Sequence, residues 1–170
     1  MRLTQVGAQK STDEAVLGSA MSKIPIDVLI VEDNVFDADM TTHALKESIL
    51  PERIKIVNDG AEALDFIFCK GDYVNRDPRQ QPKLVLLDLQ LPKVEGLEVL
   101  RRIRADPLTE DIPVVIFTTS KEDANIIKGY KLGANSFLAK RHDFDEFVKG
   151  IQALGIYWLV MNRPPMNVAG

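Results

Sequence analysis

Five side chains that could bind a metal ion or take part in a reaction stand directly after short apolar runs in this sequence. They are Glu32, Asp33, Asp88, Thr118 and Lys140. Acidic groups that lie close together repel one another, and a divalent hard cation such as Mg²⁺ removes that penalty. An ammonium group and a hydroxyl group beside such a cation would offset the charge of a phosphate. If the fold gathers these residues, the sequence predicts a site for Mg²⁺ (or Mn²⁺) and a phosphoryl group.

Asp88 is the candidate nucleophile of this site. A carboxylate can attack phosphorus and form an aspartyl phosphate, and a metal ion with Lys140 would offset the charge on the equatorial oxygens. The carboxylates of Asp33 and Asp88 are the expected direct metal ligands, while Glu32 acts directly or through water. The Thr118 hydroxyl would donate to the product phosphoryl group.

The elements that must position these residues form a repeating pattern. Each short run rich in β-branched residues is followed by a segment with apolar residues at helical spacing. The runs cover residues 26–31, 53–57, 84–87, 114–117 and 136–139. Strands bounded by helices favour parallel pairing with helices on both faces. We predict an α/β fold, a flavodoxin-like (βα)5 doubly wound parallel sheet of strand order 2-1-3-4-5, whose carboxyl strand ends share one edge.

Length and composition fit one domain with short extensions. The chain has 170 residues and a formal charge of −4, which argues against a globally basic nucleic-acid binder. We expect a flexible arm over residues 1–23, the domain with an extended last helix over 24–162, and a tail over 163–170. No apolar run approaches the roughly 20 residues of a membrane span, and the arm lacks the apolar region of a signal peptide. We therefore expect a cytoplasmic protein that does not contact a membrane.

Four segments of the sequence resemble the receiver domain of two-component response regulators. The segments are Ile30–Asn34, Leu86–Pro92, Phe117–Ser120 and Phe137–Lys140. The resemblance covers residues 24–156 and implies that Asp88 is the phosphoacceptor of a phosphorelay. It implies a signalling protein rather than an enzyme, with a histidine kinase as the phosphodonor. Nine residues follow Met161, so we expect no appended output domain.

The same resemblance implies roles for the other residues of the site. The metal ligands would be Glu32, Asp33, Asp88 and the backbone carbonyl of Gln90. Thr118 and Lys140 would contact the phosphoryl group. Phe137 occupies the position of the aromatic switch residue, where the family often has Tyr, although the same residue also fits a plain core position.

A narrower resemblance concerns the partner of the protein. The loop 71–82, the run 108–113 and the ending 156–159 are similar to the single-domain regulators that partner phytochrome histidine kinases in cyanobacteria and other bacteria. This similarity implies a light-sensing, bilin-bearing kinase as the phosphodonor. It also implies a homodimer built on the face between the fourth strand and the fifth helix.

The apolar ending of the last helix has two interpretations. Residues 156–161 are apolar without a break, and a helix that is apolar all round needs burial on all sides. The segment either folds back over the core of its own domain or forms a dimer contact. The residues that we expect at a dimer interface are Phe144, Tyr157, Trp158 and Leu159.

One residue departs from the pattern of the receiver family. Arg141 follows Lys140 where most receivers have proline, and since a cis bond before a non-proline residue costs about 3–4 kcal/mol, we expect a trans peptide there.

The main rival function is a Mg²⁺-dependent phosphatase with an aspartyl nucleophile. Such an enzyme needs a second acid two residues after the nucleophile, and Gln90 cannot serve as that acid. A nucleotide or flavin module would need a glycine-rich loop after the first strand, and residues 32–36 contain no glycine.

Overall fold

A single parallel sheet forms the centre of the protein. The computed structural model describes residues 24–119, 122–140 and 143–164. The strands are β1 (Val28–Val31), β2 (Ile54–Val57), β3 (Leu84–Leu87), β4 (Val114–Thr118) and β5 (Ser136–Ala139). They pair in the order β2-β1-β3-β4-β5, and every pair is parallel. The predicted fold class and strand order are confirmed.

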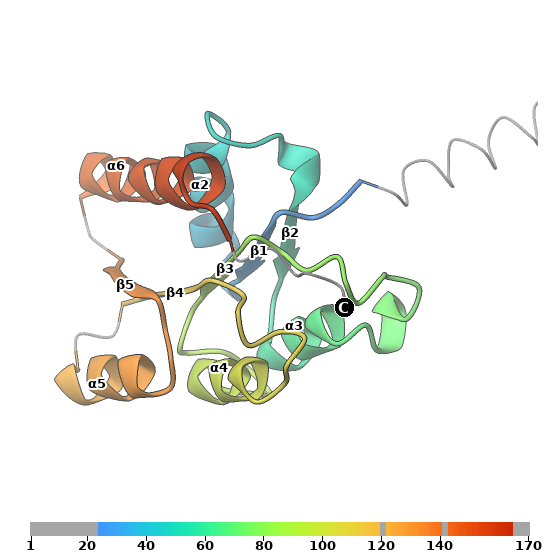
Figure 1. Ribbon diagram of the computed structural model, residues 1–170. Helices are drawn as coiled ribbons and strands as arrows, with labels where there is room; N and C mark the ends of the chain where they lie inside the picture. Colours follow the sequence, from blue (N-terminus) through green and yellow to red (C-terminus); the bar gives the residue numbers. More distant parts are fainter. Residues whose placement is uncertain (1–23, 120–121, 141–142, 165–170) are drawn as a thin grey trace, which may run out of the picture.

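In the described part of the chain, five α-helices cover the two faces of the sheet. They are α2 (Val35–Leu45), α3 (Gly60–Ile67), α4 (Gly96–Arg104), α5 (Asp123–Lys131) and α6 (Phe144–Gly155). Helices α2 and α6 lie on one face, and α3, α4 and α5 lie on the other (Figure 1). Short 3-10 turns stand at Pro51–Arg53 and Gly71–Tyr73, the second within the long loop between α3 and β3. This doubly wound arrangement leaves the carboxyl ends of the strands free to form a site.

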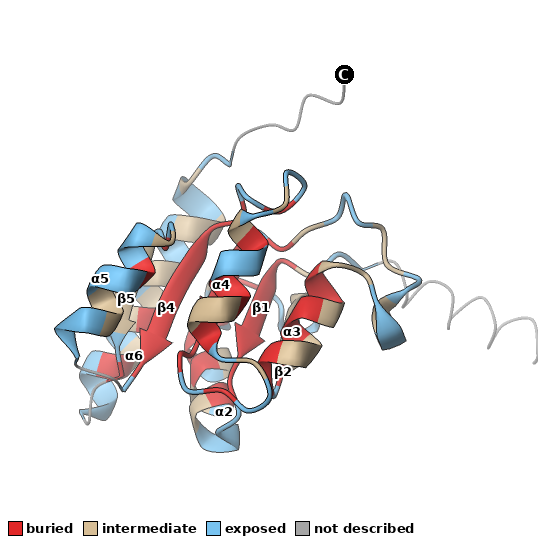
Figure 2. Ribbon diagram, turned by 90° about the horizontal axis from the view of Figure 1, so that it is seen from below, coloured by how far each residue is buried: buried red, intermediate tan, exposed pale blue. Residues whose placement is uncertain are grey.

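The core has two layers because successive strand residues point to opposite faces. Leu29, Val31, Val85 and Leu87 pack toward α3 and α4, whereas the alternate residues of the same strands pack toward α2 and α6. All residues of β1, β3 and β4 are buried, as Figure 2 shows for the red strands between the helices. Burial on both faces explains why these strands read as continuous apolar runs in the sequence.

A segment of π-helix, η3 (Ile156–Met161), continues α6. Trp158 and Leu159 are half-buried and pack against the core layer beneath α2 and α6. Tyr157 and Met161 are exposed. One side of the apolar ending therefore covers the core, and the other side faces solvent.

Some predictions concern residues beyond this description. The arm over residues 1–23, the last six residues, and Arg141 with its expected trans peptide lie outside the described residues. Among the helices that are described, none combines the length and the apolar character that crossing a bilayer requires.

Candidate active site

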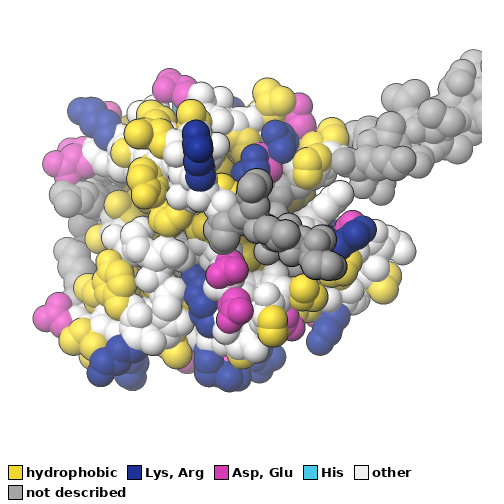
Figure 3. Space-filling view, viewed as in Figure 1, with side chains coloured by type: hydrophobic (Ala, Val, Ile, Leu, Met, Phe, Trp, Pro, Cys, Tyr) yellow, Lys and Arg dark blue, Asp and Glu magenta, His cyan; other side chains and the backbone are white. Residues whose placement is uncertain are grey.

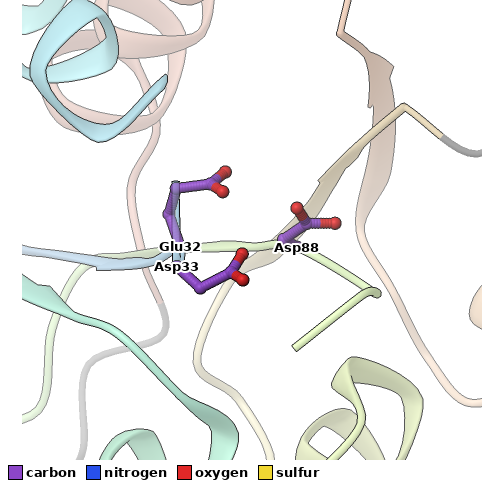
Figure 4. A group of neighbouring side chains, drawn as sticks. All are labelled: Glu32, Asp33 and Asp88. Carbon is purple, nitrogen blue, oxygen red and sulfur yellow. The ribbon is translucent and has the colours of Figure 1, made fainter. Parts of the chain in front are cut away.

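The strand register brings the predicted acidic residues to one edge of the sheet. Val31 pairs with Leu87, so Glu32 and Asp88 leave the sheet side by side. Glu32, Asp33 and Asp88 each offer a carboxylate oxygen, and these oxygens lie within 4.8 Å of one another (Figure 4). Glu32 and Asp88 are buried, while Asp33 is exposed. Because a hard divalent cation prefers oxygen ligands, this set fits Mg²⁺ or Mn²⁺ with Asp33 on the side open to solvent.

Lys140 occupies the same edge and contacts these carboxylates directly. Its Nζ donates to Asp88 Oδ2 at 2.8 Å and to Glu32 Oε2. The side chain is only 6% exposed, so the ammonium group has little water to solvate it. A buried charge is tolerated only when it is paired and hydrogen-bonded, and the carboxylates supply both conditions.

The surroundings change the acidity of this buried pair. Burial raises the pKa of Glu32, because the ionised carboxylate loses its hydration, and the contact with Lys140 only partly opposes that effect. Burial by itself lowers the pKa of Lys140, but its hydrogen bonds to Asp88 and Glu32 outweigh burial and raise that pKa. Lys140 is therefore a cation at neutral pH, positioned beside the predicted nucleophile.

The backbone after β3 holds the Asp88 side chain in place. The N–H of Gln90 donates to Asp88 Oδ1 at 3.1 Å, so Asp88 accepts bonds at both carboxylate oxygens. Asp33 and Gln90 also line a surface cavity of about 560 Å³ between the loop after β3 and Asn125 of α5. Asp33 is the member of the acidic cluster that lines this cavity. The metal-ligand role of the Gln90 carbonyl stays a prediction.

Thr118 and Phe137 lie on the neighbouring strands β4 and β5. Thr118 ends β4 and is fully buried, and its carbonyl accepts from the backbone N–H of Lys140 at 2.9 Å. That bond places the backbone of Thr118 next to the backbone of Lys140, and the contact of the Thr118 hydroxyl with a phosphoryl group stays a prediction. Phe137 is half-buried and packs against the core layer of α3 and α4. Its position is compatible with a switch role and with a plain core role.

One residue of the site was missed by sequence reasoning. Asp37, in the first turn of α2, accepts a hydrogen bond from Lys140 Nζ at 3.0 Å. A usable signal was present, because Asn34 is a typical N-cap residue and a cap there places Asp37 in the first helical turn beside the end of β1. The structure contains that cap, since Asn34 Oδ1 accepts from the N–H of Asp37 at 3.1 Å.

Comparison with known proteins points to one family. Residues 28–152 match the sequence model described as "Response regulator receiver domain". The response regulator Rcp1 of Synechocystis sp. is 38% identical over 138 residues, which cover 81% of this chain and 92% of Rcp1. The solved structure of the phosphorylated cyanobacterial phytochrome response regulator RcpA is similar, with a TM-score of 0.75 and 34% identity over 81% of this chain and 96% of RcpA. The Mn²⁺-bound structure of Rcp1 has a TM-score of 0.75 and 36% identity, covering 81% of this chain and 97% of that one.

Proposed function

Because the chain belongs to the response regulator receiver family, as its sequence motifs predicted, we propose that it receives a phosphoryl group on Asp88 in a two-component phosphorelay. The observation that carries this proposal is the contact of the buried Lys140 ammonium with Asp88 and Glu32, beside the exposed Asp33. The arrangement combines a carboxylate nucleophile, a fixed cation and a set of metal ligands. The protein is a signalling protein whose chemistry is confined to its own aspartate.

The proposed chemistry has two steps, which are transfer of a phosphoryl group to Asp88 and later hydrolysis of the aspartyl phosphate. A carboxylate oxygen of Asp88 attacks the phosphorus of a phosphohistidine on the kinase, and a P–O bond forms as the P–N bond breaks. The histidine nitrogen keeps the electron pair of the broken bond. Later, water attacks the same phosphorus, the P–O bond to Asp88 breaks, and inorganic phosphate leaves while the carboxylate is restored.

Two groups of residues around Asp88 would stabilise the negative charge of the phosphoryl oxygens. Glu32, Asp33 and Asp88 would hold Mg²⁺ together with the backbone carbonyl of Gln90. When bound, the cation would supply positive charge against the phosphoryl oxygens. Lys140 already donates to Asp88, so its ammonium is within reach of a group attached there.

The phosphoryl group would act as a switch of conformation. In this proposal the Thr118 hydroxyl donates a hydrogen bond to a phosphoryl oxygen. Phe137 on β5 is the switch residue, whose side chain changes position in response. A modification of this kind biases two pre-existing conformations and thereby changes a partner surface. The resemblance to Rcp1 and RcpA supports a phytochrome histidine kinase as the donor and a light signal as the input. We further propose a cytoplasmic location without direct nucleic-acid binding, in keeping with the net charge of −4.

We also propose a homodimer through α6 and η3. The exposed fractions of Phe144 and Tyr157 are 57% and 52%, and Val160 and Met161 are exposed beyond them. Hydrophobic side chains gather over α6 in Figure 3. Exposed large apolar side chains such as these are typical of interfaces. Trp158 and Leu159 would support this surface from beneath, since both pack against the core.

Phosphorylation of the purified full chain tests the function. Incubation with an acyl phosphate and Mg²⁺ should add one phosphoryl group, as measured by intact mass. Asp88→Asn or removal of Mg²⁺ by a chelator should abolish the addition. Equal labelling of Asp88→Asn would contradict the assignment. Turnover of an exogenous phosphomonoester would instead support the rival phosphatase.

A further inference from the structure

Asp37 is a carboxylate of the site with no role in the function described above. Its Oδ2 accepts from Lys140 Nζ at 3.0 Å, and its side chain is 26% exposed, against 6% for Lys140. Asp37 therefore lies between the buried ammonium and the surface. Asp37, Lys140 and Thr119 line a surface cavity of about 390 Å³ between α2 and α6, so loss of the Asp37 carboxylate would open a path for water to the lysine.

A closed ring of hydrogen bonds holds Asp37 in this position. The N–H of Asn34 donates to Glu32 Oε1 at 3.1 Å, and the N–H of Asp37 donates to Asn34 Oδ1 at 3.1 Å. Lys140 Nζ then closes the ring by donating to both Asp37 Oδ2 and Glu32 Oε2. The ring ties the end of β1, the first turn of α2 and the end of β5 together. Such a connected network restricts the lysine far more than one contact does.

Among the described residues, Lys140 has as many side-chain acceptors around its ammonium group as it has donors. An ammonium group has three N–H donors, and Glu32, Asp37 and Asp88 each accept one. The contacts with Asp37 and with Asp88, at 3.0 and 2.8 Å, exist together. Asp37 therefore does not draw the ammonium away from Asp88. When Asp88 becomes phosphorylated, one donor moves to a phosphoryl oxygen and the other two acceptors keep the nitrogen in place.

We propose that Asp37 is a positioning residue, which holds the Lys140 ammonium against Asp88 during phosphoryl transfer. The inference rests on the proposed function, in which Asp88 is the phosphoacceptor. Without the Asp37 acceptor, water from the cavity would take the third donor, and the ammonium would be free to turn away from the incoming group. Misplacement of a catalytic group by about 1 Å costs up to about a hundredfold in rate. Because Glu32 still tethers the lysine, we expect a loss of about tenfold.

Labelling of the full chain by an acyl phosphate at saturating Mg²⁺ and saturating donor tests the proposal. Asp37→Ala should label about ten times more slowly than wild type, whereas Asp37→Asn, whose amide oxygen still accepts, should stay within about twofold. Ala is the best helix former, so the variant should fold, and Asp37→Leu provides a second side chain without an acceptor. Asp39→Ala is the matched control, since Asp39 is exposed on the same helix, and it should label like wild type.

A double variant separates positioning from a general structural effect. A residue that acts through Lys140 loses its influence when that lysine is absent, so Asp37→Ala should cause no further slowing in a Lys140→Met background. Equal slowing in both backgrounds, or wild-type or faster labelling of Asp37→Ala, would overturn the positioning role. Failure of the wild type to label, or labelling of Asp88→Asn, would overturn the proposed function instead.

Discussion

Gly96 offers a direct test of how closely α4 packs on the nucleophile. A Cβ at Gly96 would lie 2.1 Å from the carbonyl oxygen of Asp88 and 2.7 Å from Leu89 Cα. Both neighbours are backbone atoms, so no side chain can rotate to make room. Strand β3 is paired with β1 and β4 on its two sides and cannot shift alone. Gly96→Ala must therefore displace the loop after Asp88, or the start of α4, by about 1 Å to restore van der Waals separation.

The size of the effect follows from this displacement. Overpacking of a well-packed interior costs about 1–3 kcal/mol, and the helix preference of Ala over Gly returns about 0.5–1 kcal/mol of that. Because an approach of 2.1 Å to a backbone atom is severe, the upper end of the cost applies, and we expect Gly96→Ala to lower the free energy of unfolding by about 2 kcal/mol. Since the displaced segment follows the nucleophile directly, the labelling rate of Asp88 should also fall, by about tenfold or more.

Urea denaturation and acyl phosphate labelling measure the two effects. Gly150→Ala is the matched control, because Gly150 lies inside α6 and a Cβ there would meet Leu138 Cδ1 at an ordinary 3.5 Å. That variant should be neutral or more stable by about 0.5–1 kcal/mol and should label normally. If Gly96→Ala matched Gly150→Ala in both assays, the steric reasoning would be refuted.

Four further predictions concern the charged residues and the proposed dimer. Lys140→Met should lower the free energy of unfolding without metal by about 3 kcal/mol, because it leaves buried carboxylates unpaired, and urea denaturation with and without Mg²⁺ should show that Mg²⁺ restores part of the loss. Wild type should gain about 2.7 kcal/mol of stability at a Mg²⁺ concentration a hundred times its Kd, and Asp33→Asn should lose most of that gain in the same titration. Burial by itself would raise the pKa of Asp59, but the Lys93 ammonium at 2.6 Å and backbone N–H groups lower this pKa below its ordinary value of 3.8. The contact with Lys93 therefore stabilises the fold above pH 3.8, and this stabilisation is lost as the pH falls through the pKa of Asp59 in the folded protein. Asp59→Asn should flatten this part of the dependence of the urea midpoint on pH, at and below the ordinary pKa of 3.8. Tyr157→Glu should reduce the sedimentation coefficient to that of a monomer with a beryllofluoride-type phosphoryl mimic present, and an unchanged value would argue against a dimer through η3.

The fold was predictable because burial leaves a direct trace in the sequence. A parallel strand covered on both faces reads as an unbroken apolar run, and the run 84–87 coincides with the fully buried β3, while the run 114–117 covers all but the last residue of the fully buried β4. The first run, 26–31, is longer than β1, which begins at Val28. Asp27 is buried but pairs with Arg53 at 2.8 Å, so the start of the strand depends on partners that periodicity does not show.

The main residues of the site were predictable for a topological reason. The carboxyl ends of parallel strands meet at one edge, so Glu32 and Asp88 follow adjacent strands, and Lys140 follows β5 at the same edge with β4 between it and β3. Asp37 was not predictable in the same way. It is 103 residues from Lys140 in the chain, and its side chain faces the lysine only because α2 starts directly after β1 at the Asn34 cap.

The last helix shows the same division between sequence and structure. The apolar character of residues 156–161 is evident from the sequence, but which of them cover the core is not. Helices α2 and α6 approach so closely that a Cβ at Gly155 would lie 2.9 Å from Leu45 Cδ2, and this packing turns Trp158 and Leu159 inward. The sequence by itself determined the strands, their order and the residue types at the edge of the sheet, because these follow from local periodicity and parallel topology. Only the tertiary structure decided which side chains meet around Lys140 and which face of η3 stays exposed, because those contacts join residues far apart in the chain through the packing of helices on the sheet.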